Sequence, residues 1–200
     1  VINLGSTRQY GSSDFNHVDE STQMLPIDIQ GINKVSAENY FRVYSNLYGI
    51  NAVSLRIPNC YGERQVCEGE DIGLIGGFIR SALLNNNIEV YEHDRKRNII
   101  YVKDLADIVY NISVVTSSSF QAYNVPCSQI SIKELALKIS QKTEKCKVTF
   151  KTIPSKIKAI DEGCFKVNAD KICNKMSFFE SRNLDQNLES TIQYFRNKIE

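Results

Sequence analysis

The sequence predicts an α/β fold in which helices cover a parallel sheet. Short apolar runs that suit strands are followed by stretches of helical periodicity, and then by apolar runs again. This order provides the crossover helices that parallel strands need. The chain has 200 residues, of which 42% are hydrophobic and 24% charged, so it can bury a sizeable core.

The amino-terminal quarter sets this pattern. Residues 1–5 are apolar and lead into small polar residues, as a buried strand does when it delivers Ser6 to its carboxyl end. A run rich in Ser, Asp and Asn has no periodicity and predicts a loop. A helix and a second strand follow, and Pro58 stops that strand. The predicted segments are a strand at 1–5, a loop at 11–26, a helix at 31–48 and a strand at 51–57.

The helix at 31–48 has a broad apolar front. Ala37 and Tyr44 lie on one stripe at helical spacing, and Tyr40 widens it. We therefore expect this stripe, Tyr40 included, to pack in the core. Gly49 follows the last apolar residue and is expected to end the helix.

The rest of the chain repeats the alternation of strands and helices. Ser131 has Glu134 three residues later, which is the spacing of a capping box and marks the start of a helix. The segments predicted here are a helix at 74–84, strands at 88–91 and 98–102, a helix at 103–115, a strand at 122–125, a helix at 131–141, a weak strand at 147–153, and helices at 170–176 and 184–198.

Composition and charge argue against several classes of function. The net charge of +1 argues against a dedicated nucleic-acid surface. No apolar run approaches the ~20 residues that cross a bilayer. Six cysteines without a Cys-x-x-Cys pair, with only two histidines, argue against a metal site and fit a reducing cytoplasm. The chain begins at Val1 in a strand-like run, so we expect an amino-terminal part of a longer protein to be missing.

Four short pieces, taken in order, resemble one family. They are GSTRQYG at 5–11, GINK at 31–34, LRIPNCYG at 55–62 and RNIIYVKDLA at 97–106. The chain resembles the carboxyl-terminal two-thirds of an extended short-chain dehydrogenase/reductase. Within that group it is most similar to the NAD-dependent nucleotide-sugar epimerases and dehydratases, and the resemblance spans the whole chain in order and spacing.

The resemblance implies a doubly wound Rossmann-type parallel sheet with a small α/β substrate-binding domain. The two are expected to interleave: residues 1–60 and 98–118 form the remainder of the dinucleotide-binding domain, and residues 61–97 and 119–200 form the substrate-binding domain. In family members the glycine-rich turn that cradles the cofactor pyrophosphate lies at the amino terminus. This chain lacks that turn, so it is not expected to bind NAD alone in the family's usual way.

Three residues match the catalytic positions that the resemblance implies. Ser6 corresponds to a serine or threonine that hydrogen-bonds the reacting sugar hydroxyl. Lys34 corresponds to a lysine that binds the nicotinamide ribose and lowers the pKa of a nearby phenol. That phenol belongs to a tyrosine one helical turn before the lysine, where this chain has Gln30. The resemblance also places Pro58 with Ser6 and Lys34 at the cofactor.

Three explanations for Gln30 stay open, because an amide forms hydrogen bonds but cannot act as a general base. In the first, Lys34, Tyr10 or a group of the substrate takes over proton transfer. In the second, the protein binds a nucleotide sugar without converting it. In the third, the reaction needs only hydride transfer and a hydrogen-bonding site, and water relays the proton.

The resemblance places two substrate contacts directly after the first strand. Thr7 and Arg8 occupy the positions where related dehydratases carry an acidic pair. Neither residue can supply or remove a proton as a carboxyl group does. The dehydratase reaction is therefore disfavoured.

The resemblance also implies contacts to the nucleotide. Asn59 corresponds to an asparagine near the sugar diphosphate. Arg97 corresponds to an arginine that binds the diphosphate, since a planar guanidinium suits bidentate phosphate contact. Arg64 and Lys156 are expected to be further basic contacts. Asp104 is usually structural in this family, where it caps or pairs near a helix start.

The sequence therefore predicts an NAD-dependent nucleotide-sugar epimerase that acts through a transient 4-keto sugar, with Gln30 in place of the catalytic tyrosine. The alternatives are a non-catalytic nucleotide-sugar-binding protein and an NAD(P)H-dependent reductase of keto sugars. NADP is not excluded as the cofactor. The expected partner is a nucleotide-diphosphate sugar in the cytoplasm, with no nucleic acid, membrane or metal. Family members often pair through the helix that carries the lysine, which allows a homodimer.

Overall fold

The structure is a computed structural model that describes residues 1–11, 16–69, 72–92, 95–115, 119–144, 146–159, 161, 163–176 and 179–199. Its strands are β1 (Ile2–Leu4), β2 (His17–Val18), β3 (Val53–Arg56), β4 (Asn59–Tyr61), β5 (Asn87–Tyr91), β6 (Lys96–Tyr101), β7 (Gln121–Asn124), β8 (Ser128–Ser131), β9 (Lys147–Lys151) and β10 (Lys166–Val167). Its helices are the 3₁₀-helix η1 (Thr7–Tyr10), α1 (Ile29–Tyr48), α2 (Leu74–Asn85), α3 (Val102–Val114), α4 (Ile132–Lys142), α5 (Ser155–Ala159), α6 (Asp170–Cys173) and α7 (Leu184–Ile199).

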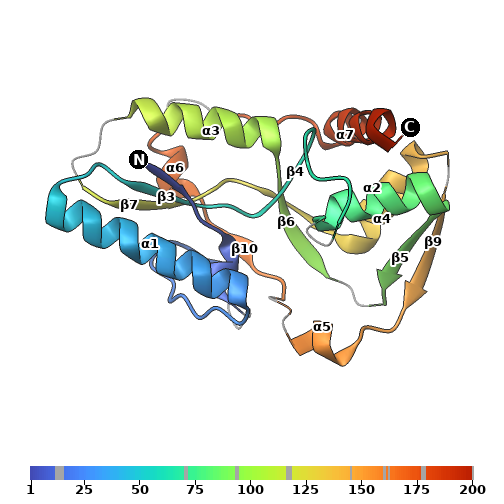
Figure 1. Cartoon of the computed structure of the whole chain (residues 1–200), viewed down its shortest axis with the longest axis horizontal. Coiled ribbons are helices and arrows are strands. Elements are labelled where there is room, and N and C mark those ends of the chain that lie inside the picture. Colours follow the sequence, from blue (N-terminus) through green and yellow to red (C-terminus); the bar gives the residue numbers. More distant parts are fainter. Residues whose placement is uncertain are drawn as a thin grey trace.

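The first sheet is parallel and has the strand order β1-β3-β7. Helix α1 lies along one face of this sheet and α3 along the other (Figure 1). Successive side chains of a strand point to opposite faces. Accordingly, Val53 and Leu55 of β3 belong to the apolar core that includes α3. Ser54 and Arg56 of the same strand contact Glu38 of α1. The predicted parallel α/β arrangement is confirmed.

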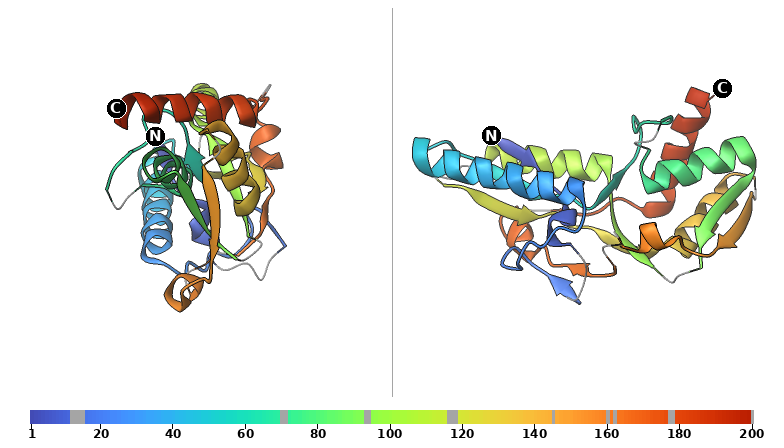
Figure 2. Two further views of the ribbon diagram at one scale, coloured as in Figure 1. Left: turned by 90° about the vertical axis from the view of Figure 1, so that its right-hand side faces the viewer. Right: turned by 60° about the horizontal axis from the view of Figure 1, so that its bottom comes forward.

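The second sheet has the order β4-β6-β8, with β4 parallel and β8 antiparallel to β6. Beside it, β5 and β9 form a parallel pair. Helices α2, α4 and α7 lie together at this end of the molecule (Figure 2). Each contributes fully buried residues to one apolar core, such as Ile79, Leu135 and Phe195.

The two regions interleave further along the chain than expected. Strand β7 pairs with β3, and Ile172 of α6 packs in the core of the first sheet. Both elements follow residue 118, where the sequence analysis ended the dinucleotide-binding region. The backbone groups of β3 require partners on both sides, and β7 supplies them on the side opposite β1.

The predicted helix ends are confirmed. Gly49 closes α1 in the left-handed conformation (φ 64°), and its N–H donates to the carbonyl oxygen of Ser45 at 2.9 Å. Ser131 caps α4 by accepting from the N–H of Glu134 at 3.0 Å. Asp104, in the first turn of α3, is buried and pairs with Arg182, which agrees with its expected structural role.

The apolar face of α1 is exposed to solvent, whereas the sequence analysis predicted that it packs in the core. Tyr40 is 68% exposed and Leu47 is 69% exposed, so the prediction that this stripe packs in the core is wrong. The residues that α1 buries are Gly31, Glu38 and Ser45, which are small or polar. Among the described residues, no helix has the length and apolar character needed to cross a membrane.

Candidate active site

A cleft of about 880 Å³ is lined by residues of both sheet regions. The first region contributes η1 and the start of α1, and the second contributes β4, β6 and the start of α2. Of the predicted site residues, the cleft contains Ser6, Thr7, Arg8, Gln30, Pro58, Asn59 and Arg97. The structure thus brings together positions from four separate pieces of the sequence.

Ser6 begins η1, and its hydroxyl is oriented by the backbone. Its Oγ accepts from the N–H of Arg8 at 3.2 Å, and its own N–H donates to the side chain of Gln9 at 2.9 Å. The oxygen is engaged as an acceptor, so the hydroxyl hydrogen is available to a group in the cleft. Ser6 thus presents a hydroxyl group to the cleft in an orientation that the backbone of η1 holds.

Gln30 lies in the first turn of α1, which approaches η1 closely. Asp28 caps the helix by accepting from the N–H of Gly31 at 2.6 Å, and it also pairs with Arg8. A Cβ at Gly31 would lie 2.6 Å from the carbonyl oxygen of Arg8, so this approach requires glycine. The contact fixes the start of α1, and Gln30 with it, beside the residues that follow β1.

Thr7 and Asn59 hold the strand ends together at the cleft. The N–H of Thr7 donates to the carbonyl oxygen of Ile57 at 3.0 Å, which joins η1 to the end of β3. The amide nitrogen of Asn59 donates to the carbonyl oxygen of Asn98 at 3.1 Å, which joins β4 to β6. The amide oxygen of Asn59 is then the group that can face a ligand.

Arg95 and Arg97 line the cleft and share one carboxylate. Arg97 donates to Asp161 and to the carbonyl oxygen of Gly163, both at 3.1 Å, and Arg95 pairs with the second carboxylate oxygen of Asp161. The two guanidinium groups supply charged hydrogen-bond donors at this end of the cleft. This end therefore suits an anionic ligand such as a diphosphate.

A comparison of the sequence with known protein families agrees with this geometry. Residues 1–125, more than half of the chain, match the family described as "NAD dependent epimerase/dehydratase family". The chain belongs to this family. The resemblance drawn from its four motifs is therefore confirmed, and NAD is the cofactor of the family.

Individual members of the epimerase/dehydratase family are also similar to this chain. A putative UDP-glucose 4-epimerase of Methanocaldococcus jannaschii is 37% identical over 98 residues, covering 48% of this chain and 32% of that protein. A dTDP-4-dehydro-6-deoxyglucose reductase of Escherichia coli is 30% identical over 138 residues, covering 68% of this chain and 43% of that protein. The chain thus spans less than half the length of these two relatives.

Solved structures of family members confirm the fold. A UDP-N-acetylglucosamine 4-epimerase from Methanobrevibacter ruminantium M1, in complex with UDP-N-acetylmuramic acid, matches with a TM-score of 0.87 at 25% identity. The match covers 99% of this chain and 63% of that chain. The described part of this chain therefore has the Rossmann-type architecture of the family.

Lys34 lies one helical turn beyond Gln30, next to the cleft rather than in its lining. Its ammonium group donates to the carbonyl oxygen of Leu4 at 2.7 Å, at the end of the strand that delivers Ser6. An ammonium group has three N–H donors, so two remain for a ligand. This donor set fits the hydroxyls of a nicotinamide ribose, as expected for a family member.

Tyr10 does not replace the missing phenol. It is 1% exposed, and its hydroxyl accepts from Arg56 at 2.8 Å and donates to Asn124 at 2.6 Å. Burial raises the pKa of Tyr10, although Arg56 and Asn124 oppose the rise. The suggestion that Tyr10 takes over proton transfer is therefore wrong, because its hydroxyl is committed within the core.

Of the further basic contacts that were predicted, Arg64 lies outside the cleft, and the side chain of Lys156 is not among the described residues. Arg64 follows the turn at Gly62 in a left-handed conformation (φ 67°) and lines a separate hollow with Glu63 and Lys103. The chain turns at this point, so Arg64 is not brought to the other candidate residues. Lys156 belongs to α5, whose next residue lines the cleft, but the side chain of Lys156 lies outside the described residues.

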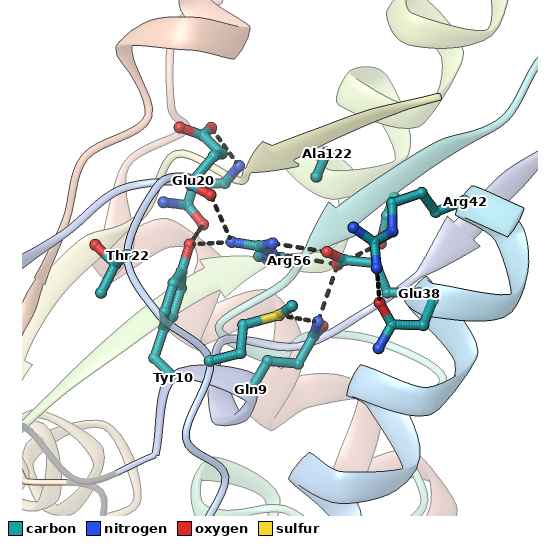
Figure 3. Close-up of polar contacts among 12 residues, drawn as sticks. Gln9, Tyr10, Glu20, Thr22, Glu38, Arg42, Arg56 and Ala122 are labelled. Atoms are coloured by element: carbon teal, nitrogen blue, oxygen red, sulfur yellow. Dashed lines mark hydrogen bonds and ion pairs between the residues drawn. The ribbon is translucent and has the colours of Figure 1, made fainter. Parts of the chain in front are cut away.

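Sequence analysis missed a buried polar network behind this site. Figure 3 shows Arg56 of β3 between Tyr10 and Glu38. Glu38 and Arg56 are each 3% exposed and are joined at 2.6 Å. Gln9 donates to the same carboxylate at 2.9 Å. One signal was available in the sequence: Glu38 lies one helical turn after Lys34, on the same face of α1.

The charges of this network stabilise each other. Burial by itself would raise the pKa of Glu38, but the hydrogen bonds and charge of Arg56, with hydrogen bonds from Gln9 and Ser54, lower it. Burial by itself would lower the pKa of Arg56. The hydrogen bonds and charge interactions with Glu38 and Tyr10 outweigh that effect and raise the pKa. Both members of the pair are therefore charged at neutral pH.

Proposed function

We propose that this chain forms the substrate-binding side of an NAD-dependent nucleotide-sugar epimerase that acts through a transient 4-keto sugar. One observation carries the proposal: a single cleft joins Ser6 and Gln30 of the first region with Asn59 and Arg97 of the second. A volume of about 880 Å³ is within the range of small-molecule sites. The cleft therefore offers polar groups for a sugar and guanidinium donors for a diphosphate.

In the proposed reaction, the C4 hydroxyl of the sugar lies between Ser6 and Gln30. Lys34, Ser6 and Pro58 would hold NAD, which would supply a reversible acceptor for the hydride of C4 and so allow the configuration at C4 to be inverted. Ser6 donates a hydrogen bond to the C4 oxygen, and Gln30 holds that oxygen without titrating. The hydroxyl proton passes to water in the cleft and is regained when the hydride returns, so protons and electrons balance.

The proposed cofactor contacts surround the end of β1. Lys34 donates to the ribose hydroxyls, and Ser6 and Pro58 complete the contact. Pro58 is buried at the junction of β3 and β4, where the cleft begins. NADP remains an alternative to NAD.

The diphosphate is proposed to bind where arginine side chains line the cleft. Arg97 and Asn59 are the main contacts, and Arg95 adds a second guanidinium group. Gly73, the N-cap of α2, and Leu74 in its first turn line the same cleft, and the amino terminus of a helix also favours an anion. The remaining proposed contacts are Thr7 and Arg8 to the sugar and Lys156 to the nucleotide.

We also propose that the protein forms a homodimer through α1. The face of this helix that carries Tyr44, Leu47 and Tyr48 is apolar and more than half exposed. Burying such a face removes apolar area from water. Light scattering of the full-length protein tests this: a mass of one subunit at micromolar concentration would contradict the dimer.

A reductase of keto sugars is the second candidate. The similarity to the Escherichia coli reductase favours it, since that relative matches 68% of this chain. A reductase would use the same cleft but would release its oxidised cofactor after each turnover. The two candidates therefore differ in the net consumption of cofactor.

The experiment uses the full-length protein with UDP- and CDP-hexoses. Formation of an epimer without net consumption of NAD supports the proposal. Consumption of added NADPH with a 4-keto sugar nucleotide supports the reductase. Saturable binding of the sugar nucleotide with no turnover in either assay overturns both and leaves a binding protein.

Replacing Arg97 with methionine is expected to weaken binding of the nucleotide sugar. Loss of charge-assisted hydrogen bonds typically costs about 1.5–3 kcal/mol, which is roughly a 10- to 100-fold increase in Kd. Isothermal titration calorimetry with UDP-hexose measures it. Arg42→Met is the control, because Arg42 lies on α1 and its Nη2 donates to Asn39. Equal Kd values for the two variants would contradict a role of Arg97 at the diphosphate.

A further inference from the structure

Gln9 is a polar side chain with no exposure to solvent, and its amide is fully used. Its Oε1 accepts from the N–H of Ser6 at 2.9 Å. Its Nε2 donates to Glu38 at 2.9 Å and lies 3.3 Å from the sulfur of Met24. The amide therefore connects the residue at the end of β1 with a residue in the middle of α1.

Glu38 gives this connection a rigid support. Its carboxylate accepts from Arg56 Nη2 at 2.6 Å and from the hydroxyl of Ser54 at 2.9 Å. Both partners belong to β3, so this strand fixes the position of the carboxylate. Figure 3 shows Gln9 and Arg56 meeting the same carboxylate from two directions. An ion pair with so many partners fixes the rotation of α1 against the sheet.

The space around Gln9 leaves little freedom. A Cβ at Gly5 would lie 2.7 Å from the Oε1 of Gln9, so the amide is packed against the backbone just before Ser6. An apolar side chain of similar size would fill this volume at less cost in desolvation. The presence of an amide is explained by the two groups it joins, rather than by packing.

We propose that Gln9 is a positioning residue for the active site. Its amide holds the backbone of Ser6 at a fixed place relative to α1, which carries Gln30 and Lys34. The hydroxyl of Ser6 and the amide of Gln30 then face one cleft in a constant geometry. This inference rests on the proposed function, because Ser6 is the group that it positions.

The test uses Gln9→Met in the full-length protein, since methionine has a similar volume and cannot make these hydrogen bonds. A misplacement of about 1 Å can lower a rate by roughly 100-fold, so kcat is expected to fall by about 10- to 100-fold. KM for the nucleotide sugar is expected to stay within about twofold, because the contacts of Asn59 and Arg97 are untouched. Thr191→Val is the control: Thr191 is equally buried, its hydroxyl donates to Asn187 at 2.7 Å, and it lies in α7.

A double variant separates positioning from general destabilisation. In a Ser6→Ala background, Gln9→Met is expected to change kcat by less than about twofold, because the group that Gln9 positions is gone. An undiminished loss of kcat in this background would overturn the proposal. So would a loss confined to KM, or an equal loss in Thr191→Val.

Amide hydrogen exchange tests the same contact without turnover. Exchange at the Ser6 N–H is expected to be at least about tenfold faster in Gln9→Met and unchanged in Thr191→Val. In Gln9→Glu the new carboxyl group, buried beside the charged Glu38, is expected to stay protonated, so that it donates to Glu38 and still accepts from the N–H of Ser6. Its Ser6 N–H is therefore expected to stay better protected than in Gln9→Met, even if methionine impairs folding. Unchanged exchange in Gln9→Met, or equal exchange in the two Gln9 variants, overturns the positioning role. A protein without turnover but with the expected exchange pattern instead refutes the proposed function.

Discussion

Glu38→Ala is expected to lower the free energy of unfolding by about 3–5 kcal/mol, because it leaves the guanidinium group of Arg56 buried without its carboxylate. Arg56 is 3% exposed and lies between Glu38 and Tyr10, so water cannot replace the lost partner. Urea denaturation of the purified full-length protein measures the change. The effect is large for one substitution, since whole domains are stable by only about 5–15 kcal/mol.

Two controls make this expectation specific. Glu89 also pairs with a cation, Lys151, but both side chains are more than half exposed. Glu89→Ala is therefore expected to cost only about 0–1 kcal/mol. The double variant Glu38→Leu with Arg56→Met is expected to be more stable than Glu38→Ala, because it leaves no unpaired charge. Equal losses for Glu38→Ala and Glu89→Ala would contradict the proposed importance of burial.

Gln30→Tyr is expected to raise kcat by at least about 100-fold, the lower end of what a positioned acid–base group contributes. Gln30 lies in the first turn of α1, in the same cleft as Ser6, so a phenol there would reach the same sugar oxygen. The ammonium group of Lys34, one turn away, would lower the pKa of that phenol. Steady-state kinetics with the sugar nucleotide identified for the wild type provide the measurement.

Gln30→Phe is the matched control, because it adds the same ring without the hydroxyl group. It is expected to leave kcat at or below the wild-type value. A Gln30→Tyr protein that folds but loses activity would show that the site is built around an amide. In that case the proton transfer through water in the wild type depends on the amide of Gln30.

The meeting of Ser6, Gln30, Asn59 and Arg97 in one cleft follows from rules that the sequence obeys. Parallel strands present their carboxyl ends at one edge of the sheet, and ligands bind there. The alternation of strands and helices predicts a parallel sheet with such an edge. The four motifs identify the residues that lie at it. The roles of these residues remain predictions, whereas their common location is now a structural observation.

The pairing of residues in the buried network could not be predicted from the sequence, because the fold selects the partners. Glu38 and Arg56 are 18 residues apart, and Gln9 and Glu38 are 29 residues apart. Sequence shows that Arg56 interrupts an apolar strand, but many acidic residues are available as its partner. Only the packing of α1 on β3 selects Glu38.

The exposed apolar face of α1 and the location of Arg64 show another limit of prediction from the sequence. An apolar stripe shows that a helix face favours contact, but it does not identify the surface that covers it. Tyr40 was therefore assigned to the core, although it is 68% exposed. A Tyr-Gly turn likewise predicts a change of direction without giving the direction, and Arg64 consequently lies outside the cleft.

The two faces of β3 have a consequence for how the chain finds its sheet. A slip of β3 by one residue would exchange its faces, placing Ser54 and Arg56 in the hydrocarbon layer and turning Leu55 toward a carboxylate. In that misaligned state Arg56 and Glu38 would each be buried without the other on opposite sides of the strand. Burying two unpaired charges costs far more free energy than burying the pair. The ion pair of Glu38 and Arg56 therefore favours one alignment of β3 during folding, in addition to stabilising the folded sheet.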